Sequence, residues 1–390
     1  MKKLEDYKKE IETCSKCGLC QSVCPIYKLT GKETIVSRGK FNLLLGLIKK
    51  DLTFSKNLEK NLSLCLHCNA CEDFCPSKIK TSEIISTAMC EYKRFYPTDK
   101  LIQSYKLFRL KLIILSLIFK TYRLLHISTF VKKLKSLILK FPIFGKYLIL
   151  FDKLAEINCK RKKIKTKKAQ LKVLYFEGCY TKHLNPSTKY ALLNTLEKNN
   201  IEVIQKRFDC CGLSYLYCGN IKKYNKLKQR NIKKLNGDYD YIVCDCATCL
   251  SALKGYNCNF SDKIIDIFEL LAIIGYKQEQ IKDKFTYHLP CHLRNKKENV
   301  SKFIETLGQG KYSKMNEFDV CCGFAGEFSL KHPILAQEIS DKKIENIEQT
   351  NSKYVLTSCP GCIIGLNKGL INKKSKIKAL NLIEFIDLNS

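Results

Sequence analysis

Cysteine is the residue type through which this sequence can do chemistry, because the chain of 390 residues contains 23 of them. Eight lie in two copies of the pattern C-x-x-C-x-x-C-x-x-x-C-P, which begin at Cys14 and Cys65. Three thiolates spaced by two residues can wrap around three irons of a cubane, and the fourth lies beyond that loop and reaches the other cluster. The pattern therefore predicts two [4Fe–4S] clusters. One is held by Cys14, Cys17, Cys20 and Cys75, and the other by Cys24, Cys65, Cys68 and Cys71.

Zinc is the alternative metal for these eight cysteines. Structural zinc sites use paired Cys-x₂₋₄-Cys elements, which this twofold pattern fits poorly. Pro25 and Pro76 fix the backbone where the chain leaves each loop. His67 lies inside the second loop, and we expect it to be an exposed residue that tunes the cluster, since cysteines already fill the coordination.

The second half of the chain carries a five-cysteine pattern twice. In each copy a single cysteine precedes an adjacent pair followed by glycine, and a C-x-x-C element comes last. Equivalent cysteines are 111 to 113 residues apart, which indicates a duplicated domain. The predicted metal ligands are Cys179, Cys210, Cys211, Cys246 and Cys249 in the first copy, and Cys291, Cys321, Cys322, Cys359 and Cys362 in the second.

Five soft ligands around one pocket suit either an iron–sulfur centre or zinc. We expect an iron–sulfur centre in at least one copy, with zinc or no metal in the other as the alternative. His288 and His292 flank Cys291 and are expected to form hydrogen bonds around the site. The alternative is that one of them binds the metal directly. Cys244 is close enough to Cys246 to substitute as a ligand. The remaining cysteines are expected to be ordinary buried thiols.

The elements that position these cysteines follow from hydrophobic periodicity. The first segment reads as helical, with helices predicted at 39–52 and 54–64. Strands are predicted at 172–177, 201–204 and 241–244 with a helix at 187–198, and the same order returns from 285 to a strand at 354–357. Alternating strands and helices predict parallel sheets with crossover helices, whose carboxyl ends bind ligands.

The predicted fold class is α+β multidomain. A helical two-cluster ferredoxin-type domain at 1–100 is followed by a connector at 101–170 and by a duplicated α/β cysteine-rich domain at 171–280 and 281–390. The connector carries a net charge of +16 out of +32. Its apolar run at 112–119 is too short to span a membrane. It is expected either to lie on an anionic membrane as an amphipathic helix or to dock on the α/β domain.

The arginine content and the first ten residues indicate which partners and which location to expect. Only eight of the 69 cationic residues are arginine, and nucleic-acid sites favour the arginine fork, so no nucleic-acid partner is expected. The first ten residues contain no apolar stretch, so we expect no export signal and reduced cysteines in the cytoplasm. Peripheral contact with the inner face of the membrane is the accompanying expectation.

Several segments resemble a known family. They read CDCATCLSALK at 244–254, HLPCH at 288–292, CCGFAG at 321–326 and TSCPGC at 357–362. These resemble the iron–sulfur subunits of glycolate oxidase and of the related D-lactate and anaerobic glycerol-3-phosphate dehydrogenases, which pair a two-cluster ferredoxin domain with two CCG cysteine-rich domains. Leu289 departs from the aspartate that this family often has, which weakens any catalytic role for its segment.

The resemblance implies an electron-transfer subunit without catalytic residues of its own. An FAD-containing dehydrogenase subunit would oxidise glycolate or D-lactate, and electrons would leave to a membrane quinone or another carrier. The sequence has no G-x-G-x-x-G fingerprint after a strand and no P-loop, so no flavin is expected on this chain. The alternatives are a catalytic subunit of the heterodisulfide reductase type, an anaerobic glycerol-3-phosphate dehydrogenase subunit and, from charge alone, a zinc-bearing nucleic-acid binder.

Overall fold

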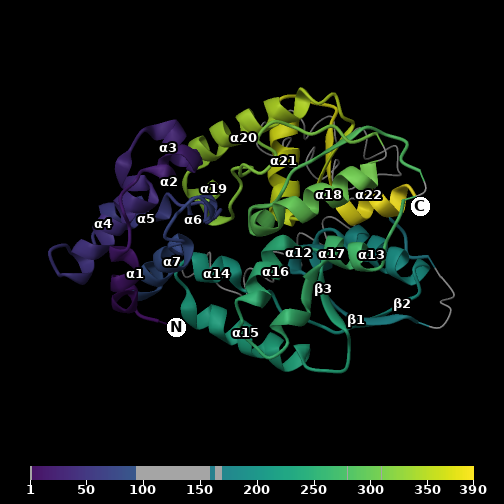
Figure 1. Cartoon of the computed structure of the whole chain (residues 1–390), viewed down its shortest axis with the longest axis horizontal. Coiled ribbons are helices and arrows are strands. Elements are labelled where there is room, and N and C mark those ends of the chain that lie inside the picture. The colour runs from purple at the N-terminus through teal and green to yellow at the C-terminus, as the bar shows by residue number, and fades with distance from the viewer. Residues whose placement is uncertain (1, 94–158, 163–168, 279, 309) are drawn as a thin grey trace, which may run out of the picture.

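The computed structural model describes residues 2–93, 159–162, 169–278, 280–308 and 310–390. A helical N-terminal part lies against two α/β halves (Figure 1). The predicted connector at 101–170 falls outside the described residues, apart from 159–162 and 169–170, and so do the amphipathic helix and the apolar run expected there. In the described part of the chain, no helix combines the length and the apolar character needed to cross a membrane.

The N-terminal part is built from short helices joined by the cysteine loops. They are η1 (Leu4–Tyr7), α1 (Lys8–Glu12), α2 (Leu19–Val23), α3 (Pro25–Thr30), η2 (Glu33–Ile35), α4 (Ser37–Ile48), α5 (Lys56–Ser63), α6 (Ala70–Asp73) and α7 (Thr81–Tyr92). The two helices predicted at 39–52 and 54–64 are α4 and α5. Phe41, Leu44 and Ile48 recur at helical spacing and are buried in one apolar cluster with α1 and α7. Ser55 caps α5 by accepting a hydrogen bond from the Leu58 N–H at 3.2 Å.

The first α/β half contains a parallel sheet of order β2-β1-β3-β4. Its elements are β1 (Leu171–Phe176), α12 (Cys179–His183), α13 (Pro186–Lys198), β2 (Ile201–Gln205), α14 (Leu213–Tyr217), α15 (Ile221–Leu235), β3 (Tyr241–Cys244), α16 (Ala247–Lys254), η3 (Ser261–Lys263), β4 (Ile264–Asp266) and α17 (Ile267–Ile273). Central strands β1 and β3 carry buried apolar runs at 173–176 and 242–244, as strands covered by helices on both faces require.

The second half repeats this plan with a parallel sheet of order β5-β6-β7. Its elements are β5 (Phe285–Tyr287), η4 (Cys291–Lys296), α18 (Lys297–Gly308), α19 (Glu327–Lys331), α20 (Pro333–Glu348), β6 (Tyr354–Thr357), α21 (Pro360–Asn372), β7 (Lys378–Asn381) and α22 (Leu382–Leu388). The helical first part and the two parallel sheets confirm the predicted fold class.

The last helix of each α/β half contacts the other half. Helix α22, at the end of the second half, packs on α13 of the first, and α17 of the first half packs against α18 of the second. One apolar core therefore runs through both halves. Figure 1 shows this packing, with the yellow C-terminal helix beside teal α13. Because each half completes the core of the other, the two cysteine patterns are held in a fixed relation.

Asp266 caps α17 and Asn381 caps α22 in the same way. Each forms a capping box with the glutamate three residues later, Glu269 or Glu384. Asp266 is fully buried, and its Oδ2 has no hydrogen-bond partner among the described residues. Burial raises the pKa of Asp266 to about 7, because a charge is costly in a medium of low dielectric constant.

The Asp266→Asn variant, which copies Asn381, is expected to stabilise the protein at pH 8 more than at pH 5. A folded-state pKa above the unfolded value means that the native protein binds the proton more tightly, so wild-type stability falls as pH rises from about 4 to about 7. Asparagine keeps the cap and carries no charge, so the gain at pH 8 should exceed that at pH 5 by ~1–3 kcal/mol. Thermal melting under anaerobic conditions measures this difference, and an equal shift at both pH values would contradict it.

Candidate metal centres

The first cavity lies in the helical part between α2 and α4, and cysteines from both ferredoxin-type motifs line it. They are the four predicted ligands Cys14, Cys17, Cys20 and Cys75, together with Cys71. Gly18 turns the chain inside the loop at φ +87°, a conformation that glycine adopts without steric cost. Arg38 also lines this cavity and donates a hydrogen bond to the Lys16 carbonyl oxygen at 2.9 Å, which holds the loop in place. The last cysteine of the second motif thus lies with the first three of the first motif.

The second cavity lies between α3, α4 and α7 and is lined by Cys24, Cys65, Cys68 and Cys71. Cys71 lines the first cavity as well, so it lies between the two sites. Lys40 is only 2% exposed and lines the second cavity, where its ammonium donates to the carbonyl oxygens of Ile35 and Leu64. Burial raises the pKa of the Cys65 thiol, and the charge of Lys40 opposes that rise.

The five cysteines of the first α/β half meet at the carboxyl ends of β1 and β3. Cys179 begins α12 just after β1, Cys246 caps α16 after β3, and Cys249 lies in the first turn of α16. Cys210 and Cys211 come from the loop that precedes α14. Hydrogen bonds join Cys179 to Cys210 and Cys211 to Cys249, and bonds from Cys179 and Cys211 hold the pKa of Cys210 well below its usual range.

The second half gathers its five cysteines in the same order. Cys291 begins η4 after β5, Cys359 caps α21 after β6, and Cys362 lies in the first turn of α21. The Cys322 thiol donates to Cys362 Sγ at 3.5 Å. Hydrogen bonds from Cys291 and Cys322 hold the pKa of Cys321 well below its usual range. The structure therefore brings together every cysteine that the two patterns singled out, in two separate sets.

The glycine after each adjacent cysteine pair has a backbone role in the site. Gly212 and Gly323 have φ values of +83° and +82°. The N–H of Gly212 donates to Cys210 Sγ and that of Gly323 donates to Cys321 Sγ, each at 3.5 Å. A positive φ turns this N–H toward the sulfur and lets both thiols of the pair face one pocket.

The two C-x-x-C loops touch each other. The N–H of Ala247 donates to the Ser358 carbonyl oxygen at 2.8 Å, and Thr248 Oγ1 lies 3.5 Å from Cys359 Sγ. Thr248 Oγ1 also lies 3.3 Å from His292 Nδ1. A side chain of the first C-x-x-C loop therefore contacts a cysteine of the second set.

The helical part packs directly on the second cysteine set. Arg294 Nε lies 3.4 Å from Asp73 of α6, and Arg294 Nη1 lies 3.4 Å from Asp319, which ties the two parts together. Ser63 Oγ of α5 lies 3.1 Å from His332 Nε2. One apolar cluster lies across this contact and includes cysteines from both sides: Cys24, Cys68, Cys291 and Cys321.

A stack of three rings joins the helical part to both halves. The His67 and Tyr217 rings are stacked at 4.1 Å with an interplanar angle of 5°, and the Tyr217 hydroxyl lies 3.3 Å from His292 Nε2. His67 is half-buried, so the expectation that it is exposed was wrong. The error arose because Tyr217, which covers it, lies 150 positions away in the sequence. Tyr217 was missed altogether, since no local pattern marks it.

The donor chemistry of the four cysteine sets fits iron–sulfur centres. Each set offers four or five thiols, and backbone N–H groups point at the sulfur atoms of Cys65, Cys210 and Cys321. Thiolates and N–H···S hydrogen bonds are the features by which proteins bind such clusters and set their potentials.

Family models match both parts of the chain. A 4Fe–4S dicluster domain model matches residues 10–79, and a cysteine-rich domain model, CCG, matches residues 173–254 and 285–367. The probable glycolate oxidase iron–sulfur subunit of Bacillus subtilis (strain 168) is 24% identical over 420 residues, covering 97% of this chain and 93% of its own length. The chain belongs to the glycolate oxidase iron–sulfur subunit family. It is thus an iron–sulfur protein with a dicluster domain and two CCG domains, as the cysteine patterns predicted.

Other relatives match nearly the whole chain or one part of it. The glycolate oxidase iron–sulfur subunit of Escherichia coli (strain K12) is 24% identical over 379 residues, covering 90% of this chain and 88% of that protein. Lactate utilization protein A of Geobacillus sp. (strain WCH70) is 24% identical over 237 residues, covering 56% of this chain and 99% of that protein. The shorter match shows that part of the chain can correspond to nearly a whole protein.

Proposed function

We propose that this chain is the electron-transfer subunit of a complex that oxidises a 2-hydroxy acid, glycolate or D-lactate. A separate FAD-containing subunit carries out the oxidation, and the electrons leave through this chain to a membrane quinone or another carrier. The observation that carries the proposal is the contact between cysteine sets, in which Cys24 and Cys68 share an apolar cluster with Cys291 and Cys321. The names of the full-length relatives support the substrate class.

Each cysteine set has a proposed occupant. Cys14, Cys17, Cys20 and Cys75 hold one [4Fe–4S] cluster, and Cys24, Cys65, Cys68 and Cys71 hold the other. The two sets of five CCG cysteines hold an iron–sulfur centre in at least one half, with zinc as the alternative in the other. Such centres, when bound, accept and release single electrons.

The chain's own residues place positive charge beside these sulfurs. Lys40 lines the second cavity, and Lys343 lies beside Cys321 and Cys322 with 2% of its surface exposed. The ammonium of Lys343 donates to the Glu317 carbonyl oxygen, and burial lowers its pKa to about 8. Buried cations favour the more negative, reduced state of a nearby centre, so these lysines raise its reduction potential.

The proposed location is the cytoplasm, where thiols stay reduced, with peripheral contact at the inner face of the membrane. The heterodisulfide reductase type remains the second candidate, because both CCG sets retain all five cysteines and their C-x-x-C loops touch. In that candidate the CCG half itself would reduce a disulfide.

Anaerobic purification of the tagged chain from its native host tests the proposal. A flavoprotein should copurify, and glycolate or D-lactate should bleach the visible iron–sulfur absorbance of the complex. About eight irons per chain would confine clusters to the dicluster domain, and about twelve or more would place iron in the CCG halves as well. Absence of a flavoprotein, together with bleaching reversed by a disulfide substrate on the isolated chain, would favour the second candidate and overturn the first.

A further inference from the structure

His288 is buried without the partners that an imidazole needs. It directly follows β5, and its N–H donates to the Leu356 carbonyl oxygen of β6 at 2.9 Å, so the backbone is fixed. The side chain is fully buried, and both ring nitrogens lack a hydrogen-bond partner among the described residues. A buried polar group without a partner costs about 1–3 kcal/mol, and native structures seldom retain one. A ligand outside the protein chain is the partner that this ring lacks.

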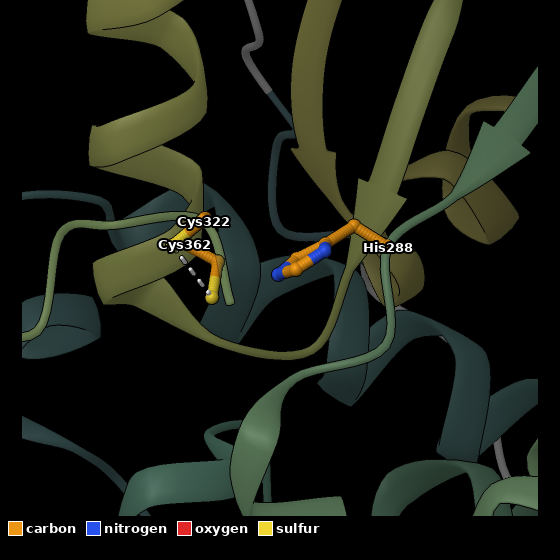
Figure 2. A group of neighbouring side chains, drawn as sticks. All are labelled: His288, Cys322 and Cys362. Carbon is orange, nitrogen blue, oxygen red and sulfur yellow. Dashed lines mark hydrogen bonds between the residues drawn. The ribbon is translucent and has the colours of Figure 1, made fainter. Parts of the chain in front are cut away.

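The ring points at two thiols of the second CCG set. Figure 2 shows the imidazole extending from the end of its strand toward Cys322 and Cys362. One donor atom from each of the three residues lies within 4.8 Å of the others, and the two sulfurs are 3.5 Å apart. Metal–sulfur and metal–nitrogen bonds of about 2.0–2.3 Å place tetrahedral donors roughly 3.3–3.8 Å apart. The two sulfurs have this spacing, and a nitrogen of the imidazole lies within 4.8 Å of both, close to the position of a third ligand.

The first CCG half has no histidine at the equivalent position. Tyr175 and Tyr287 are equivalent, because each lies at or next to the carboxyl end of its strand, with its hydroxyl against the residue that precedes a C-x-x-C cysteine, Asp245 at 2.9 Å or Ser358 at 3.3 Å. The residue after Tyr287 is His288, and the residue after Tyr175 is Phe176, which is fully buried. The two halves therefore share their five cysteines but differ at this position, which is histidine in the second half and phenylalanine in the first.

We infer that His288 is a metal ligand of the second CCG centre, which makes that centre a mixed cysteine and histidine site while the first is bound by cysteine alone. The inference rests on the proposed function only in requiring that the CCG cysteines bind a metal. The ion is one that accepts both thiolate and imidazole, which means an iron of an iron–sulfur centre or zinc. Imidazole ligation of an iron–sulfur centre raises its reduction potential relative to thiolate ligation.

Nitrogen hyperfine spectroscopy of the full chain, labelled with ¹⁵N-histidine and reduced anaerobically, tests an iron occupant. X-ray absorption at the zinc edge tests a zinc occupant. The wild type should give a directly bound nitrogen in one of the two measurements. That signal should vanish in His288→Phe, which places at this position the residue that the first half tolerates, and it should remain in His292→Gln. The His288→Phe centre should also lose its metal to a chelator about tenfold faster.

The outcomes separate this inference from the proposed function. Metal in the CCG halves without a bound nitrogen, or with a nitrogen signal that survives in His288→Phe, would overturn the ligand assignment alone. A chain without metal in either CCG half would instead overturn the proposed occupants of the CCG cysteines. His288→Cys supplies a soft ligand at the same position and should retain the metal with a changed spectrum, which excludes misfolding as the cause of metal loss in His288→Phe.

Discussion

The Cys75→Ser variant is expected to lose about four irons per chain. These are the irons of the cluster whose other proposed ligands are Cys14, Cys17 and Cys20. Cys75 belongs by sequence to the second motif, yet it lines the cavity of Cys14, Cys17 and Cys20. A serine oxygen is a harder and less easily ionised ligand than a thiolate, and loss of one of four ligands exposes an iron to solvent. Iron and sulfide analysis of anaerobically purified protein measures the loss, and EPR of the reduced protein identifies the missing signal.

Pairs of substitutions decide whether the two ferredoxin-type motifs cross. If Cys17 and Cys75 serve the same cluster, the Cys17→Ser/Cys75→Ser double variant should lose no more iron than either single variant. Cys17→Ser/Cys24→Ser should lose about eight irons, because those residues line different cavities. The reverse result, additive loss for the first pair and no further loss for the second, would mean that each motif binds its own cluster.

The Gly323→Ala variant is expected to destabilise the protein by ~3 kcal/mol or more and to empty the second CCG centre. A β-carbon at this position would lie 2.7 Å from the Ala336 carbonyl oxygen in the backbone of α20. That atom cannot move without displacing a helix that packs on α21, which carries Cys362. The residue must also keep φ at +82°, which costs a non-glycine residue about 1–2 kcal/mol. Thermal melting and metal analysis measure both effects.

Two matched glycines separate the causes in this experiment. Gly275 has φ +62°, and a β-carbon added there would meet nothing within 4 Å, so Gly275→Ala measures the conformational cost alone. Gly212 is the equivalent glycine of the first CCG half, and there the nearest atom is Tyr224 Cδ2 at 3.2 Å, on a side chain that can shift. We expect the loss of stability to rise from Gly275→Ala through Gly212→Ala to Gly323→Ala. A Gly323→Ala variant as stable as Gly275→Ala, with its metal retained, would contradict the backbone contact.

The two CCG halves differ in the charged residues that lie beside their cysteines. Beside the first set lies Asp245, whose pKa burial raises to about 6. At the equivalent place in the second half lies the neutral Ser358, and Lys343 and His288 lie nearby. If both CCG sets hold iron–sulfur centres as proposed, a carboxylate beside one and a cation beside the other would make the second centre the easier to reduce. The duplication therefore supplies two sites of one architecture with different electronic surroundings.

The sequence by itself determined the cysteine sets and the order of the elements. Ligands two or three residues apart share one loop whatever the rest of the chain does, so their spacing alone predicts the cluster loops at Cys14 and Cys65. Strand and helix periodicity is equally local, and it predicted α4, α5, α13 and the strands that end at the CCG cysteines. The duplication was readable because its five cysteines recur at a nearly constant offset.

Only the tertiary structure decided which surfaces meet. Three contacts join residues far apart in the sequence. They are the stacking of His67 on Tyr217, the ion pair of Arg294 with Asp73, and the packing of α22 on α13. Such contacts depend on the shape and charge of two folded surfaces, which no local spacing encodes. The sequence showed that His288 lies three residues before Cys291, but it did not show which way the side chain points. Its direction toward Cys322 and Cys362 depends on the pairing of β5 with β6, which places the end of one strand opposite the loop that follows another.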